Sequence, residues 1–342
     1  MSNLEVGVNL SGGGARGSYQ AGVLKGLSEI LKEQGLLEGG QNPLKYWSAV
    51  SAGSINAAVC AAGIHDFEGA AKQLCELWTN VTPEQVYLTD IKSLTSNGAR
   101  WARDLTFGSF TKEKSAKSLL DTKPLWDLID KNISYDQLDE NIKQGHVKGL
   151  ACTAYSYFNN RTVTFLSSAH DTGWNKPRRY SVRVPIRTEH IVASCSIPML
   201  FPSVRIGNEF FADGSFRNTS PISPIIHMGA KKILVVGVRG PNEFYDKEYR
   251  EEPSIAKISG SILNALFFDT TDVDLERVTH INELVDTFKR DIVTKRSDYS
   301  AIHFHVIRPS RDVSKIAEEK FQYFPKMLKF MIGGLGPRTE SA

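Results

Sequence analysis

The chain has 342 residues, of which 41% are hydrophobic, so it is long enough to bury the core of one large domain or two ordinary ones. Its 41 lysines and arginines nearly balance its 38 aspartates and glutamates, and a net charge of +3 gives no reason to expect nucleic acid as the partner. Nowhere do about 18 apolar residues follow one another, which excludes a membrane-spanning helix and limits any membrane contact to a peripheral one.

The start of the chain carries neither the basic nor the apolar region of a secretory signal peptide. We therefore expect a cytoplasmic or peripheral membrane location, with export by a machinery that reads no such signal as the alternative. The cysteines lie far apart without a Cys-x-x-Cys pair, which favours reduced thiols in a core. They are Cys60, Cys75, Cys152 and Cys195.

Two strand–loop–helix units open the chain. The first runs from an apolar strand at residues 6–10 through a glycine-rich loop into a helical pattern that opens at Tyr19. The second runs from a strand at residues 46–50 through a turn at residues 51–53 into a small, helix-prone segment at residues 55–62. Strands that alternate with helices predict a parallel sheet with helices on both faces.

The sheet is expected to draw on the whole chain, because further apolar or β-branched segments follow. They are residues 149–157, 162–166, 209–212, 232–238 and 302–307. No internal repeat or low-complexity linker separates them, so we expect one domain over residues 1–342. Within it, residues 5–240 hold the motifs described below, and residues 241–342 hold a helical region and a final strand.

Two segments stand apart from this alternation. Residues 82–123 mix basic and aromatic side chains, and we expect an insertion or lid that lies over the site or contacts lipid. Residues 255–294 carry an apolar stripe at helical spacing, most regular from Ile281 to Ile292. A helix packed on the core is the preferred interpretation, and a helix on a membrane surface is the alternative.

A run of glycines follows the first strand. It formally matches the G-x-G-x-x-G pattern of dinucleotide-binding folds, but the second strand ends in Ser51 and not in the acidic residue that would hold a ribose. No Gly-Lys-Ser or Gly-Lys-Thr follows it either, which argues against a phosphate-binding Walker loop. Successive glycines at the start of a helix can instead direct backbone N–H groups toward one point and stabilise developing negative charge, as in an oxyanion hole. Arg16 would add positive charge beside this hole or pin the loop. The candidate oxyanion-hole residues are Gly12, Gly13, Gly14, Arg16 and Gly17.

Ser51 lies at the turn of the second unit and is the candidate nucleophile. A nucleophile elbow places a serine on a tight strand-to-helix bend with small residues two places on either side, and here these are Ala49 and Gly53. Ala49 replaces the usual glycine but keeps the position small. The alternative is that Ser51 or Ser54 only caps the following helix.

An activated serine needs a base, and Asp213 is the candidate. None of the eight histidines follows a turn that would direct it toward Ser51. Asp213 ends an apolar strand and enters a glycine turn at Gly214, although an ordinary Asp-Gly turn has the same sequence. Because the carboxyl ends of parallel strands share one edge of a sheet, we expect the glycine loop, Ser51 and Asp213 to converge there. No His-Glu-x-x-His motif or Cys/His cluster occurs, so we expect no metal.

In their order and spacing, the glycine loop, the serine turn and the Asp-Gly pair resemble the patatin-like phospholipase family. The pattern of that family is a glycine-rich oxyanion loop, a G-x-S-x-G elbow and a later D-G-[GA] aspartate. Residues 193–202 also resemble the family's alanine-serine stretch ahead of the aspartate strand. The resemblance covers residues 5–240, and the chain departs from the pattern at Ala49 and Ser215. Both substitutes are small, so we expect activity to survive.

The resemblance implies a three-layer α/β/α fold with a mainly parallel central sheet, related to the α/β-hydrolase type of architecture. It also implies a lipid acyl hydrolase of the phospholipase A or lysophospholipase type, with a Ser51–Asp213 dyad and an acyl-enzyme intermediate. The N–H groups of Gly13 and Gly14 would hold the oxyanion. A lipid is then the substrate, and no cofactor or metal takes part in the chemistry of the dyad. The alternatives are a non-catalytic lipid- or phosphate-binding module that keeps the fold, and a NAD-dependent enzyme.

Overall fold

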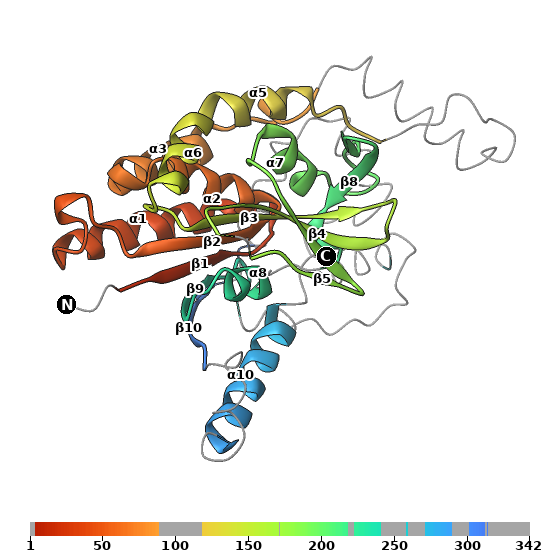
Figure 1. Cartoon of the computed structure of the whole chain (residues 1–342). Coiled ribbons are helices and arrows are strands. Elements are labelled where there is room, and N and C mark those ends of the chain that lie inside the picture. The colour runs from red at the N-terminus through yellow and green to blue at the C-terminus, as the bar shows by residue number, and fades with distance from the viewer. Residues whose placement is uncertain are drawn as a thin grey trace, which may run out of the picture.

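The computed structural model of the chain describes residues 4–88, 118–170, 172–217, 222–240, 271–288 and 301–311, together with Ile258 and Val313. In these residues, one mixed and mainly parallel sheet lies between helices on its two faces (Figure 1). The predicted three-layer α/β/α fold is therefore confirmed.

Ten strands form this sheet within the described residues. Their bounds are β1 Val6–Leu10, β2 Leu44–Val50, β3 Gly149–Ser156, β4 Arg161–Ser168, β5 Asn175–Lys176, β6 Arg179–Arg183, β7 Val204–Ile206, β8 Glu209–Asp213, β9 Lys232–Val236 and β10 His303–Ile307. The strand order is β10-β9-β1-β2-β3-β4-β6-β5, and β8 pairs with both β3 and β7. The strands from β10 to β3 are parallel to one another, whereas β4 and β8 both run antiparallel to β3. The sequence pattern missed β5, β6 and β7, which are short, and of which β5 and β6 are also largely polar.

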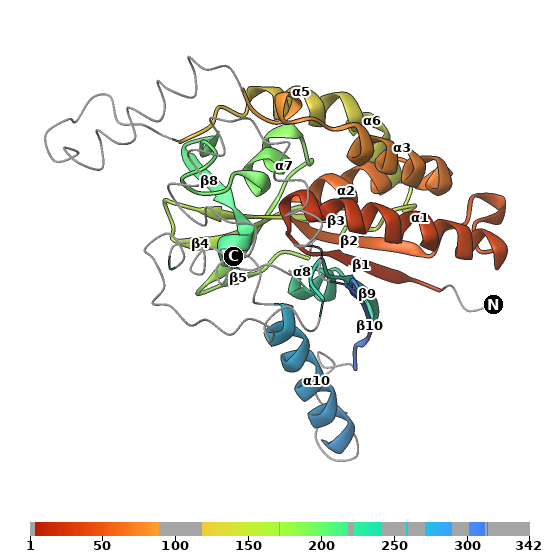
Figure 2. The same cartoon turned by 180° about the vertical axis from the view of Figure 1, so that it is seen from behind.

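Helices pack against both faces of the sheet. On one face, the described residues form α1 Gly17–Glu33, α2 Ala52–Ala62, α3 Phe67–Asn80, α5 Lys123–Asn132, α6 Tyr135–Lys143 and α7 Thr188–Cys195. The opposite face carries α8 Ile222–His227 and α10 Thr271–Phe288, as both views show (Figure 1 and Figure 2). Each face has its own group of buried apolar side chains. The four cysteines are free, and all except the half-buried Cys75 lie buried in the larger group, as expected for core thiols.

The helix α2 is central to the larger core. Every residue of this helix is buried, and it contacts β2 and β3 as well as α1, α3, α6 and α7. Its small side chains permit this close packing on all sides, which a larger helix would not allow. Because Ser51 directly precedes α2, the burial of the helix fixes the position of the serine.

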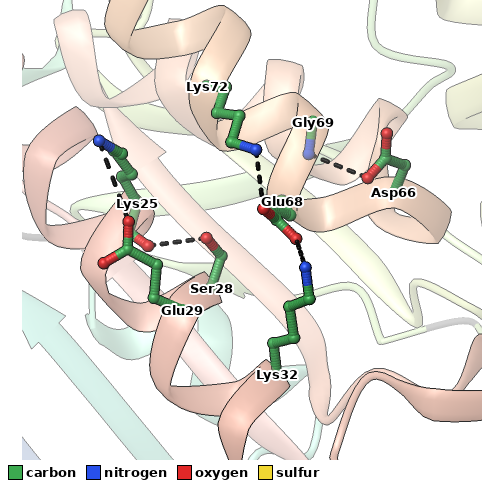
Figure 3. Close-up of polar contacts among 8 residues, drawn as sticks. All are labelled: Lys25, Ser28, Glu29, Lys32, Asp66, Glu68, Gly69 and Lys72. Carbon is green, nitrogen blue, oxygen red and sulfur yellow. Dashed lines mark hydrogen bonds and ion pairs between the residues drawn. The ribbon is translucent and has the colours of Figure 1, made fainter.

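The contact between α1 and α3 includes a surface ion-pair group (Figure 3). Glu68 of α3 accepts hydrogen bonds from Lys32 of α1 at 2.6 Å and from Lys72 at 2.7 Å. The bond from Lys32, and after it the bond from Lys72, lowers the pKa of Glu68 to about 2. Lys32 lies near the end of α1, about 22 Å along the helix axis from its first residue, Gly17. Exposed pairs of this kind add little stability, so the group is a minor support of the packing.

The expected insertion is described only at its two ends. Residues 89–117, on which the lid prediction mainly rests, lie outside the described residues. The two ends are paired, because the N–H of Leu88 donates to the carbonyl of Asp121 at 2.8 Å. The second end also bonds to the segment before β7, where the N–H of Leu119 donates to the carbonyl of Met199 at 3.0 Å.

The predicted helical stripe falls partly on α10. Leu275 is buried in the smaller core and Val278 packs against it, which supports the packed-helix interpretation for this part of α10. Ile281 is 45% exposed, and the stripe beyond residue 283 lies outside the side chains that the structure describes. Within the described ranges, no helix combines the length and the apolar character that crossing a bilayer requires.

Candidate active site

Two strands meet end to end along one side of β3. The strand β2 pairs with β3 up to Val50, which lies opposite Thr153. The next residue of β3, Ala154, lies opposite Asp213, the last residue of β8. Since β2 runs parallel to β3 and β8 runs antiparallel to it, their C-terminal ends point toward each other. Ser51, which follows β2, therefore faces Asp213.

The route of Asp213 into the site differs from the predicted one. The glycine loop and Ser51 do follow parallel strands, β1 and β2. Asp213 does not, because β8 is antiparallel to β3 and enters the site from beyond the carboxyl edge of the sheet. The chain turns back in a β7–β8 hairpin at Gly207 and Asn208. A Gly-Asn pair between apolar residues is a known hairpin signal, and it was the sequence feature that would have revealed this turn.

The backbone of Ser51 is strained. Its φ of 55° and ψ of −134° lie in a region that residues with a side chain rarely adopt, at a cost of roughly 1–3 kcal/mol. The serine side chain makes no capping bond to α2, which counts against the helix-cap alternative. Gly53 is required here, because a Cβ at this position would lie 2.6 Å from the carbonyl oxygen of Leu10. Ala49 is fully buried in the core, which its small side chain permits.

Ser194 of α7 holds the strained turn in place. Its buried hydroxyl donates to the carbonyl of Thr153 at 2.6 Å. A hydroxyl has one hydrogen, so Ser194 accepts its other two bonds, from the N–H of Ser51 at 2.8 Å and the hydroxyl of Ser54 at 3.0 Å. Ser194 lies within residues 193–202, for which the sequence pattern predicted a family resemblance but no role for this serine. Its position in a buried helix just before the aspartate strand was the available signal.

Asp213 is a buried carboxylate, 1% exposed. Burial raises the pKa of Asp213 to about 6, while a hydrogen bond from the Ser51 side chain and then the bonds from Ser215 act to lower it. The N–H of Ser215 donates to the carboxylate at 2.8 Å. The Ser215 hydroxyl is buried and has no hydrogen bond of standard geometry in the described part of the chain. The N–H of Asp213 itself donates to the carbonyl of Ser196 at 2.8 Å.

Two glycines allow the backbone segments of the site to approach one another. A Cβ on Gly12 would lie 2.2 Å from the hydroxyl oxygen of Ser215 and 3.3 Å from the Cβ of Ser51. A Cβ on Gly214 would lie 2.4 Å from the carbonyl oxygen of Thr153. A side chain on Gly12 would crowd the aspartate turn and the serine turn, and a side chain on Gly214 would push the aspartate turn away from β3.

The other loop residues have distinct surroundings. Gly13 is buried against Val238, whereas Gly14 is exposed and has a φ of 54°, which favours glycine. Arg16 is half-buried at the end of the short 3₁₀ helix Gly14–Arg16. Gly17 begins α1 and packs on α2, where a Cβ would come within 3.0 Å of the side chain of Ala52. The structure thus brings Gly12 to Ser51 and uses Gly17 in the contact between α1 and α2.

A buried polar network braces the glycine loop. The side-chain amide of Gln20 donates to the carbonyls of Ser11 at 2.8 Å and Val236 at 3.2 Å. The amide of Asn56 donates to Gln20 at 3.0 Å, and the indole N–H of Trp78 donates to Asn56 at 2.7 Å. These bonds join α1, α2 and α3 to the end of β1. Sequence reasoning missed them, although buried amides within apolar helix faces were visible.

The histidines of neighbouring elements make other contacts. His190 accepts a hydrogen bond from the N–H of Arg187 at 3.0 Å, and His227 stacks on Trp174. Asp213, by contrast, is under the influence of the Ser51 side chain, which lowers the pKa of its carboxyl group. Among the described residues, no group of three or more His, Cys, Asp and Glu side chains is placed to hold a metal ion.

The fold and this site define a mixed α/β protein in which a serine and an aspartate meet at the ends of two opposed strands. The sequence profile of the patatin-like phospholipase family matches residues 9–226, which is more than half of the chain. The chain therefore belongs to the patatin-like phospholipase family. The matched region includes the glycine loop, Ser51 and Asp213.

Solved structures with a similar chain course come from bacteria and from human cells. VipD from Legionella pneumophila is 15% identical with a TM-score of 0.36, covering 97% of this chain and 66% of that one. ExoU in its complex with SpcU, from the type III secretion system of Pseudomonas aeruginosa, is 18% identical with a TM-score of 0.31, covering 69% and 44%. Human GIVD cytosolic phospholipase A2, bound to a fluorophosphonate inhibitor, is 13% identical with a TM-score of 0.32, covering 69% and 41%. The chain thus spans less than two thirds of the length of each. A comparison with curated proteins finds no match.

Proposed function

We propose that the chain is a lipid acyl hydrolase of the phospholipase A or lysophospholipase type, with Ser51 as nucleophile and Asp213 as its base. Membership of the patatin-like phospholipase family indicates a lipid ester hydrolase. The observation that carries the assignment of residues is the end-to-end meeting of β2 and β8. It joins a serine in a strained turn to a buried carboxylate whose raised pKa suits a base.

In the first half of the reaction, Asp213 accepts the hydroxyl proton of Ser51 while the serine oxygen attacks the ester carbonyl carbon. The negative charge of the tetrahedral intermediate then lies on the former carbonyl oxygen. The N–H groups of Gly13 and Gly14 donate to this oxygen, and Gly12 keeps the loop against Ser51. Losing one such donor typically costs about 2.7–4 kcal/mol of transition-state stabilisation.

In the second half, the intermediate collapses to an acyl-serine as Asp213 returns the proton to the leaving alcohol oxygen. Asp213 then takes a proton from water, whose oxygen attacks the acyl carbonyl carbon. A fatty acid leaves, and Ser51 recovers its hydroxyl proton from Asp213. Every proton moves between these two side chains, the substrate and water, so the steps need no metal or cofactor. Arg16 adds positive charge near the loop.

Mass spectrometry of the products released from a mixed lipid extract tests this function. We expect the wild type to release fatty acids and the matching deacylated lipids, and Asp213→Asn to release neither above background. Asparagine has nearly the same shape as aspartate but accepts no proton. The matched control is Asp127→Asn, at an exposed position of α5, which should hydrolyse lipid like the wild type. A folded wild type that binds lipid and releases nothing would favour the non-catalytic binding module.

A further inference from the structure

Three turns lie together beyond the carboxyl edge of the sheet, next to the catalytic pair. They join β3 to β4 at residues 157–160, β5 to β6 at residues 177–178, and β7 to β8 at residues 207–208. The pairings of β4 with β3 and β6, and of β8 with β3, place all three turns at the same end of these strands. Figure 1 and Figure 2 show β4, β5 and β8 at the side of the molecule away from the N-terminus.

This end of the strands presents three exposed aromatic side chains. Phe158 is 76% exposed, Tyr157 44% and Phe210 45%. They are neighbours, because the N–H of Tyr157 donates to the carbonyl of Phe210 at 3.0 Å. Phe158 lies four residues beyond Ala154, the residue opposite Asp213, so it projects outward by roughly 13 Å from the level of the catalytic pair. Single exposed apolar residues are common, but a projecting group of three indicates a contact surface.

Neighbouring contacts brace the base of the aromatic group, at Tyr157 and the β3–β4 turn. Tyr155 contacts Tyr157, with ring centres 5.5 Å apart, and Phe216, at 5.1 Å. Arg217 lies over the Tyr155 ring and donates to the carbonyl of Asn160 at 2.8 Å, which ties the β3–β4 turn to the segment after Asp213. A braced projection loses little conformational entropy on binding, so it is suited to insert into a surface.

The surroundings of the aromatic group are basic. Glu209, the acidic residue nearest to the turns in these strands, already accepts bonds from Ser156 at 2.8 Å and from the amide of Asn159 at 3.1 Å. Positive side chains occupy the turns and the adjoining strand ends. They are Arg161, Lys176, Arg178, Arg179, Arg205 and Arg217.

We propose that this surface, defined by Tyr157, Phe158, Phe210 and the six basic residues around them, docks the protein on an anionic lipid bilayer. The aromatic rings enter the interface between headgroups and acyl chains, and the basic residues contact the negatively charged headgroups. Docking in this orientation presents the carboxyl edge of the sheet, and with it Ser51 and Asp213, to the bilayer. The inference rests on the proposed lipid substrate, which must be taken from such a surface.

Binding to vesicles tests the docking surface apart from catalysis. The Ser51→Ala protein is used, so that the lipids stay intact, and its sedimentation with vesicles of phosphatidylcholine and phosphatidylserine in equal parts is measured. Adding Tyr157→Ser and Phe158→Ser should weaken binding about tenfold or more. The matched control is Ile30→Ser, which removes an exposed apolar side chain from the far part of α1 and should leave binding unchanged.

The basic residues of the surface are tested by two matched substitutions at opposite ends of β6. Arg178→Ser, in the β5–β6 turn, should weaken binding to the mixed vesicles, and Arg183→Ser, exposed at the other end of β6, should not. Vesicles of phosphatidylcholine alone should bind the unchanged surface much more weakly, and added salt should weaken binding to the anionic ones.

The docking surface is wrong if the aromatic variant binds mixed vesicles like its parent, or if the Ile30→Ser control loses binding equally. It is also wrong if the protein does not bind vesicles and these aromatic residues instead form a dimer interface, which gel filtration would show. The same substitutions are also made in the protein that keeps Ser51. Turnover of a water-soluble ester by these variants checks that they fold with an intact site. An absence of turnover in the wild type would contradict the proposed function and leave the vesicle result to stand by itself.

Discussion

Asp213 combines burial with a hydrogen bond to the serine that it is proposed to activate. The two have opposite effects on its pKa: burial raises it, and the bond to Ser51 lowers it, with burial the larger. The outcome, a pKa of about 6, keeps the carboxylate ionised at neutral pH and makes it a stronger base than an exposed aspartate.

Activity should therefore depend on pH through Asp213. We expect kcat/KM for a water-soluble ester to rise with pH through a midpoint near 6 and then to level off, because only the ionised carboxylate accepts the serine proton. Steady-state rates over a pH series in one constant-ionic-strength buffer measure this limb. A flat profile across that region would show that Asp213 is not the base.

Ser215 is, with Ala49, one of the two residues at which the chain departs from the family pattern, and its side chain lowers the pKa of Asp213. Ser215→Ala should therefore move the midpoint of the same kcat/KM profile to higher pH. Ser203→Ala, a half-buried serine before β7, is the control and should leave the midpoint in place. An unmoved midpoint in Ser215→Ala would mean that the hydroxyl has no electrostatic effect on the base.

At the scale of elements, α7 supports the strained turn between β2 and α2. Ser194→Ala would leave the N–H of Ser51 and the hydroxyl of Ser54 without their buried acceptor. We expect a loss of roughly 2–3 kcal/mol in the free energy of unfolding and a fall in kcat. Urea unfolding and steady-state kinetics of the same preparation measure the two effects.

The control for this substitution lies on the same segment. Ser196→Ala removes one buried hydroxyl, which donates to the carbonyl of Val192 at 2.8 Å and not to Ser51 or Ser54. It should cost less stability and leave kcat close to that of the wild type. Equal effects of the two substitutions on unfolding free energy and kcat would show that the hydrogen bonds of Ser194 do not support the serine turn.

The direction of β8 is the clearest case of an element that the sequence pattern did not predict correctly. An apolar run ending in an aspartate is the same in a parallel and an antiparallel strand, so the pattern alone leaves the direction open. The short β7 and the turn at Gly207 decide it, by returning the chain toward the site from outside the sheet. The buried bonds of Ser194 to Ser51 and Ser54 were equally hidden, because they join residues more than a hundred positions apart.

At the scale of the molecule, the apolar strand segments and their alternation with helices predicted most of the sheet. The strands at residues 6–10, 46–50 and 149–157 lie where expected, because buried parallel strands leave a strong apolar signal. The candidate site came from the order of three motifs, and its supporting contacts came only from the structure. The expectation of one domain over residues 1–342 stays a prediction.

The buried carboxylate should also make the stability of the whole fold depend on pH. Because the pKa of Asp213 is raised above its unfolded value, the native state binds its proton more tightly, and this stabilising contribution is lost as pH rises from about 4 through about 6. The wild type should lose about 3 kcal/mol of unfolding free energy across this range relative to Asp213→Asn. Denaturant unfolding of both proteins at a series of pH values measures the difference, and parallel curves would contradict it.

The most direct test of the central claim is covalent labelling of the serine. A fluorophosphonate probe, followed by peptide mass spectrometry, should modify Ser51 in the wild type, and the labelling should be lost in Ser51→Ala and strongly slowed in Asp213→Asn. Labelling at another residue, or none in a folded wild type, would contradict a Ser51 nucleophile, and equally fast labelling of Asp213→Asn would contradict Asp213 as its base.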